Sequence, residues 1–164
     1  MELALGEEVI PFLSGSCLFV RSDADIGFFP QIYNEDWIFM APHIERSSIC
    51  SLGSIRQEIY DPFSDPSRPA FQEPGEIIAD GLFALLACCH YTDRFHQDTW
   101  NAILSKRREW LTVLTERSRN PLHRAMLATA RALCDRVTAL DCANYVSDLE
   151  HDRQTWNSRL KELT

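Results

Sequence analysis

A proline-rich stretch at residues 61–74 separates two parts of this chain that differ in hydrophobic period, and this change constrains the fold most strongly. Pro62, Pro66 and Pro69 follow one another closely there, and each lacks the amide hydrogen that a helix interior or a central strand uses. Before the stretch, apolar residues come in short runs or alternate with polar ones, and after it they recur at helical spacing. We therefore interpret residues 1–164 as a single domain in which residues 61–74 form a seam between residues 1–60 and a helical region at 75–164.

Two segments of the first part have the pattern of short strands. Residues 17–20 form a β-prone apolar run after the break at Ser14–Gly15–Ser16, and residues 55–60 alternate between apolar and polar side chains. We expect these segments to pair in a small N-terminal sheet. The predicted fold class is thus α+β, and mostly α.

The residues after the seam predict a bundle of three or four helices. Residues 75–91 carry a wide apolar face, and a second helix is expected to be capped by Thr92 or Asp93, with Lys106, Arg107 and Arg108 on its polar face. A third helix is expected to begin at Pro121, because proline is favoured in the first helical position. The helical period then continues to the end, and the pattern leaves open whether residues 141–144 break it into two helices.

Charge and cysteine usage exclude several classes of function. The formal net charge is −8, which argues against nucleic acid or an anionic membrane as the main partner. The chain has neither a basic N-terminal region nor an apolar run approaching the length of a membrane span, so we expect no export signal and no span. Six cysteines without C-x-x-C spacing indicate reduced thiols and a cytoplasmic location, and the pair Cys88–Cys89 is expected to pack in the core.

The stretch Tyr33–Asn34–Glu35–Asp36–Trp37 places two adjacent carboxylates among aromatic residues. Burying a carboxylate beside apolar groups costs free energy and raises its pKa, so this pattern is unusual for a plain solvated surface. One interpretation is a general base held near the proton that it abstracts. The other is a helix start in which Asn34 or Asp36 is the N-cap and Glu35 lies in the first turn. The two are evenly matched on these residues.

A second acidic motif, Asp23–Ala24–Asp25, follows the first predicted strand. Paired aspartates at this kind of position hold a divalent cation in enzymes that use nucleotide sugars, because hard cations prefer oxygen ligands. The same residues are also ordinary turn formers, and we favour a turn that leads to Gly27.

Residues 14–40, SGSCLFVRSDADIGFFPQIYNEDWIFM, resemble the acceptor side of family 2 glycosyltransferases of the GT-A fold. In that family a glycine-containing turn, a strand ending in arginine, a phenylalanine-containing link and an E-D pair follow in this order. The segment GSIRQEIYDPF at residues 53–63 is similar to the part that returns to the sheet. The resemblance covers about residues 6–80, so residues 1–60 would be a partial acceptor region.

The resemblance implies roles for individual residues. Asp36 would be the catalytic base that deprotonates the acceptor hydroxyl, with Glu35 as its neighbour. Trp37 would line the acceptor pocket, and the substrate contacts expected beside it are Tyr33, Asn34 and Arg56.

The chain also departs from the family pattern. The nucleotide-binding half of the family, roughly a hundred residues or more, has no counterpart before Glu35, and Asp23 and Asp25 lie too close to Glu35 to be its metal site. No resident cofactor is therefore expected, and Mg²⁺ or Mn²⁺ would bind only where a nucleotide-binding half is supplied.

Two classes of function remain at this point. The first is a glycosyltransferase-like protein that moves a sugar from a nucleotide-sugar donor to a hydroxyl acceptor and is incomplete as this chain alone. The second is a non-catalytic helical interaction module. If the nucleotide-binding half is missing, the first third leaves apolar surface unpaired, and this surface would be expected to bind that half or to form a homo-oligomer.

Overall fold

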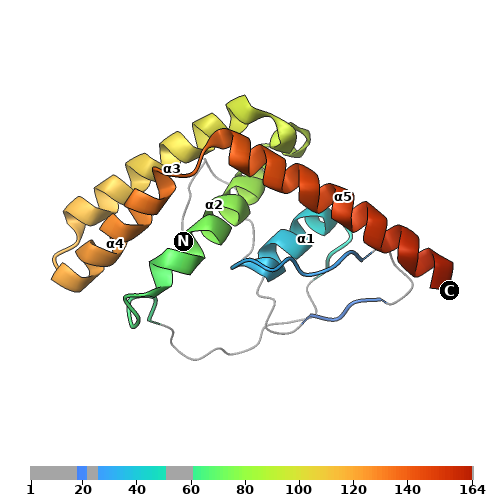
Figure 1. Cartoon of the computed structure of the whole chain (residues 1–164), viewed down its shortest axis with the longest axis horizontal. Coiled ribbons are helices and arrows are strands. Elements are labelled where there is room, and N and C mark those ends of the chain that lie inside the picture. The colour runs from blue at the N-terminus through green and yellow to red at the C-terminus, as the bar shows by residue number, and fades with distance from the viewer. Residues whose placement is uncertain (1–17, 22–25, 51–60, 164) are drawn as a thin grey trace.

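The structure is a computed structural model that describes residues 18–21, 26–50 and 61–163. The regular elements in these ranges are all helical: α1 (Glu35–Glu45), α2 (Arg68–Ala87), the 3₁₀ helix η1 (Tyr91–Phe95), α3 (Gln97–Arg117), α4 (Pro121–Cys134) and α5 (Ala139–Leu163). Helix α2 contacts α1, η1, α3 and α4, and α3 and α4 lie side by side (Figure 1). Helix α5 packs on α3 and η1 and carries the chain to its C-terminus.

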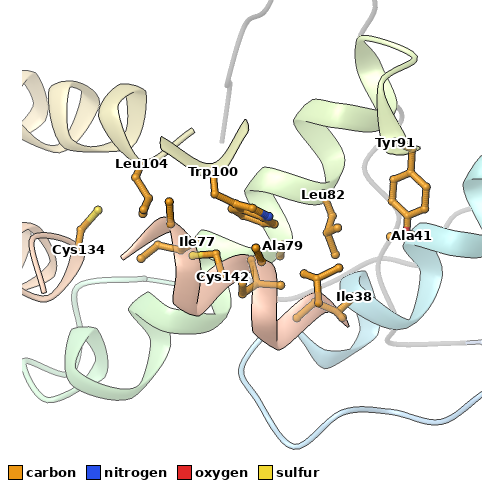
Figure 2. Packing of buried hydrophobic residues seen from close by; sticks show 14 of the residues in the cluster. Ile38, Ala41, Ile77, Ala79, Leu82, Tyr91, Trp100, Leu104, Cys134 and Cys142 are labelled. Carbon is orange, nitrogen blue, oxygen red and sulfur yellow. The ribbon is translucent and has the colours of Figure 1, made fainter. Parts of the chain in front are cut away.

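The core is centred on Trp100, in the first turns of α3, whose side chain is fully buried. A Cβ atom added to Gly81 of α2 would lie 2.3 Å from Cζ3 of Trp100, so glycine is required where the indole ring crosses α2. The Trp100 Nε1–H group donates a hydrogen bond of 2.7 Å to the Arg94 carbonyl, which satisfies the polar end of the buried ring. Figure 2 shows Ala79, Ile77 and Leu104 around this ring.

Helix α1 is a short helix with consecutive buried residues, Ile38 to Ala41. Ile38 and Ala41 join the same core as α2 (Figure 2). Pro42 lies in the last part of the helix, where its missing amide hydrogen removes an internal hydrogen bond, and the helix ends soon after it, at Glu45.

Side-chain caps define the boundaries of α4 and α5. The Asn120 side chain accepts a hydrogen bond of 2.9 Å from the Leu122 amide, and Pro121 occupies the first turn, so the predicted helix start at this proline is confirmed. At the start of α5, the Asp141 carboxylate accepts from the Thr138 amide at 3.0 Å, while the Thr138 hydroxyl accepts from the Asp141 amide at 3.1 Å. This reciprocal pair is a capping box. Residues 141–144, which the sequence left open as a break, therefore lie inside α5, and the break between the two helices lies at residues 135–138.

The segment before α1, at Gly27 and Phe28, packs on α5. Gly27, at φ +72°, donates its backbone N–H to Asn157 Oδ1 at 3.2 Å, and the Phe28 ring lies 6.1 Å from the Trp156 ring. A left-handed backbone is easily adopted by glycine. These contacts position the chain that leads into α1.

The prediction of an N-terminal sheet is wrong. Residues 18–21 are described and form no strand, residues 55–60 and Cys17 lie outside the described residues, and no strand occurs anywhere in the described ranges. The fold of the described chain is therefore all-α, and its mostly helical character is confirmed. An extended run needs a partner strand to satisfy its amide and carbonyl groups, and the described residues offer none.

Two further expectations also need correction. Helix α2 begins at Arg68, with Pro69 in its first turn, so the second half of the seam at 61–74 is helical. Cys88 and Cys89 are exposed at the end of α2, where Cys89 takes a left-handed φ of 57°. They terminate the helix and do not pack in the core.

Candidate functional site

The predicted site residues lie where the chain enters α1. Asn34 immediately precedes the helix with φ 60°, and its side chain makes no capping hydrogen bond. Glu35 is exposed, whereas Asp36 and Trp37 are half-buried. The Asp36 Oδ1 atom accepts a hydrogen bond of 2.9 Å from the Trp37 amide. A helix does start here with Glu35 in its first turn, as one of the two interpretations held, but the Asn34 side chain does not cap it. The Asp36 carboxylate satisfies one amide of the first turn.

The backbone of this segment is pressed against α2. A Cβ atom added to Gly75 would lie 2.0 Å from the Tyr33 carbonyl oxygen, so any larger residue at position 75 would push the segment away. The Tyr33 ring meets the Phe71 ring edge-on at 6.3 Å, and the Trp37 ring lies 4.7 Å from the Phe83 ring. The contacts of Tyr33 and Trp37, before and after Asp36 in the sequence, thus hold this segment against α2.

Of the six predicted site residues, five are neighbours in the sequence and lie together. Arg56 lies outside the described residues, as do Asp23 and Asp25 of the second acidic motif. The roles of these residues stay predictions.

A second polar constellation, absent from the sequence-based prediction, is buried between α2 and α3. The Arg107 side chain is 6% exposed and donates to both oxygens of Glu73, from Nε at 2.7 Å and from Nη2 at 2.8 Å. Its Nη1 atom donates to Asp80 Oδ2, and Glu76 Oε2 lies 4.0 Å from Nη2. We call these four residues the Arg107 cluster. It places three carboxylates around one guanidinium group.

Burial, together with the charges inside the Arg107 cluster, shifts the pKa values of Asp80, Glu76 and Arg107. Burial raises the pKa of Asp80 to about 7, although the Arg107 charge opposes the change. Burial also raises the pKa of Glu76, and Arg107 and the Asn34 side chain oppose it. The carboxylates in turn hold the pKa of Arg107 above its ordinary value.

The Arg107 cluster connects the two constellations, because the Asn34 side chain of the predicted site lowers the pKa of Glu76. The sequence contained one signal: Glu73, Glu76 and Asp80 recur at helical spacing on a helix whose other residues on that face are apolar. Arg107 was assigned to the polar face of its helix, and the structure corrects this assignment.

A cavity of about 320 Å³ lies beside the Arg107 cluster, between the second half of α2, η1 and the first half of α3. Asp80 and Arg107 contribute to its wall together with apolar side chains of α2 and α3. A smaller cavity of about 30 Å³ lies between α1, α2 and α5 and is lined mostly by apolar residues. Neither cavity is lined by Asp36.

Two searches of the described residues bear on metal ions and membranes. No group of three or more His, Cys, Asp or Glu side chains in the described part of the chain has an arrangement suited to a metal ion. Among the helices described, none combines the length and the apolar character that crossing a bilayer requires.

Comparison of the chain with models of protein families, with curated proteins and with solved structures found no match.

Proposed function

We propose that this chain is the acceptor-side portion of an inverting, family 2-like glycosyltransferase in which Asp36 is the general base. The observation that supports the proposal best is the position of the Glu35–Asp36 pair in the first turn of α1, on a segment braced against Gly75. A base must be held within reach of its proton in a defined geometry. The order of motifs around this pair supplies the link to sugar transfer.

In the proposed reaction, the Asp36 carboxylate takes the proton of an acceptor hydroxyl as that oxygen attacks the anomeric carbon of the donor sugar. The new bond joins the acceptor oxygen to this carbon, and the bond to the nucleoside diphosphate breaks with its electron pair. Attack from the face opposite the leaving group inverts the anomeric centre. Tyr33 and Trp37, whose rings pack on α2, keep Asp36 at the acceptor.

A nucleotide-binding half would have to hold the donor, and Mg²⁺ or Mn²⁺ would bind only with that half. We place the reaction in the cytoplasm, because Cys88 and Cys89 are exposed free thiols and such thiols persist in reducing compartments.

The first test is genetic. It asks whether the DNA upstream of the Met1 codon, in the same reading frame, or a neighbouring gene encodes a nucleotide-binding half. A genome that encodes none in either place contradicts the proposal.

The second test is enzymatic and uses the chain together with that half. Asp36→Asn keeps the shape and hydrogen bonding of the side chain but removes its basicity, so kcat for nucleoside diphosphate release should fall about 10²- to 10⁴-fold. Donor binding, measured by calorimetry, should stay unchanged. Glu45→Gln is the matched control, because Glu45 is an exposed carboxylate at the other end of α1 and its loss should leave turnover within a few-fold of the parent enzyme. Equal turnover of the Asp36→Asn variant and the parent would remove Asp36 from the role of base.

A second candidate, a helical interaction module, is favoured by large apolar side chains at the surface. Phe19 is 80% exposed, Phe71 58% and Trp156 46%, and aromatic residues of this kind are common in protein interfaces. This function predicts a stable oligomer that binds no nucleotide sugar. Donor binding separates the two candidates. Calorimetric titration with a nucleoside diphosphate sugar, on the chain together with its nucleotide-binding half, should show binding only for the transferase, and light scattering shows whether the chain forms the oligomer that the interaction module predicts.

A further inference from the structure

The cavity beside the Arg107 cluster has the features of a ligand site. Its volume of about 320 Å³ is at the lower end of the range for small-molecule sites. The apolar part of its wall comes from Ala84 and Leu85 of α2 and from Ala102 and Ile103 of α3. One buried carboxylate, that of Asp80, contributes to this wall, and its side chain is only 5% exposed. We infer that the cavity binds a small organic ammonium cation with an apolar body, and that Asp80 is its counter-ion.

The geometry of Asp80 leaves one oxygen available for such a ligand. Asp80 Oδ2 accepts from Arg107 Nη1, and no described residue donates a hydrogen bond to Oδ1. An ammonium group in the cavity would donate a hydrogen bond to this oxygen and add a positive charge beside the three carboxylates of the Arg107 cluster.

The charge balance favours a cation over an anion. The Nε, Nη1 and Nη2 atoms of Arg107 all donate hydrogen bonds to Glu73 or Asp80. Few N–H groups of the guanidinium therefore remain to bind an anionic ligand. Glu76, 4.0 Å from Arg107, adds a third carboxylate to the same cluster. Of the remaining basic residues in the cavity wall, Lys106 is exposed and His90 pairs with Asp93 at 3.3 Å. An anion would therefore approach a region of net negative charge.

Binding should depend on pH, because a cation has to displace the proton that Asp80 holds near neutral pH. Among the described residues, the charged and titratable groups around Asp80 are Glu73 and Glu76 on α2, Arg107 and Lys106 on α3, and Cys88, His90 and Asp93 at the end of α2 and in η1. The charge of the N-terminal amino group also lowers the pKa of Asp80. With the pKa of Asp80 at about 7, affinity for the cation should weaken about tenfold between pH 8 and pH 6.

The experiment titrates the full chain with benzylamine and cyclohexylamine and follows binding by calorimetry and by the amide resonances of Ala84 and Ala102. Benzyl alcohol and cyclohexanol are the neutral isosteres, and benzoate is the anionic one. At pH 8 each amine should bind at least about tenfold more tightly than its alcohol, as a charge-assisted hydrogen bond implies. Equal binding of amine and alcohol, tighter binding of benzoate, or failure of both amines to bind at millimolar concentration would overturn the inference.

Three variants test the assignment to Asp80. Asp80→Asn should remove the preference for amine over alcohol, and its far-UV circular dichroism checks that it is folded. Lys106→Gln removes a competing cation and should strengthen amine binding, whereas a site for anions would be weakened by the same change. Because imidazoles also titrate near neutral pH, His90→Gln serves as the control for the pH effect. Loss of the pH dependence in His90→Gln, or its persistence in Asp80→Asn, would refute the role of Asp80.

Discussion

Asp80 should make the stability of this protein fall as the pH rises toward neutrality. Its pKa is about 7 in the folded chain against an ordinary value of 3.8, so the folded state holds a proton that the unfolded state has released. The stability contributed by this group is fully present below pH 3.8 and is lost as the pH rises through about 7. Asp80→Asn cannot titrate and should therefore flatten the pH profile of the unfolding free energy.

The expected size of this effect follows from the two pKa values. Each pH unit between them corresponds to about 1.4 kcal/mol, so Asp80 alone should lower the unfolding free energy by roughly 2 kcal/mol between pH 5 and pH 7. The side chain is 5% exposed, so solvent screening reduces this value little. Urea unfolding of the parent and of Asp80→Asn, followed by circular dichroism at several pH values, measures the difference between the two slopes.

Asp65→Asn is the matched control for this measurement. It removes the same formal charge from the exposed loop before α2, where hydrogen bonds from Ser67 lower the pKa of Asp65. Its profile above pH 5 should run parallel to that of the parent protein. Parallel profiles for the parent and Asp80→Asn would refute the reasoning, because they would show that Asp80 is ionised in the folded chain throughout this range.

Three other substitutions test the packing. Arg107→Met leaves the cluster carboxylates buried without their cation and should lower the unfolding free energy by about 3–5 kcal/mol, whereas a loss below 1 kcal/mol would contradict the burial of the cluster. Gly75→Ala drives a methyl group into the Tyr33 carbonyl and should cost about 1–3 kcal/mol, with amide shift changes concentrated at the start of α1. Asn120→Ala removes the cap of α4 and should cost about 1 kcal/mol in urea unfolding, while Asn120→Asp, which also caps, should cost little.

The presence of helices after the seam was predictable because their signals are local, although the expected cap at Thr92 or Asp93 was wrong, since these residues lie in η1 and α3 begins at Gln97. Pro121 and the Asn120 cap define a helix start within three residues, and the spacing of apolar residues in 75–163 is that of amphipathic helices. The start of α1 was one of two interpretations that the residues 33–37 allowed. The sequence also drew attention to Asp36, but whether Asp36 is a base stays a prediction.

The predicted sheet failed for a different reason. Residues 17–20 have strand propensity, but a strand exists only when a second strand accepts its hydrogen bonds, and propensity carries no information about a partner. The burial of Cys88 and Cys89 was also misjudged, because an apolar run continues up to them while α2 ends at Ala87. Cys88 and Cys89 follow the last residue of α2 and are exposed, because the chain turns away from the core where the helix ends.

The sequence by itself determined the helical character of residues 75–163, since hydrophobic period and capping residues act over a few positions of the chain. Only the tertiary structure decided where the charges lie. Arg107 is 34 positions from Glu73 and 27 from Asp80, and in a sequence pattern it looks like any arginine between a lysine and another arginine. Packing of α3 on α2 removes water from all these groups at once, and that shared desolvation is what pairs them and raises the pKa of Asp80.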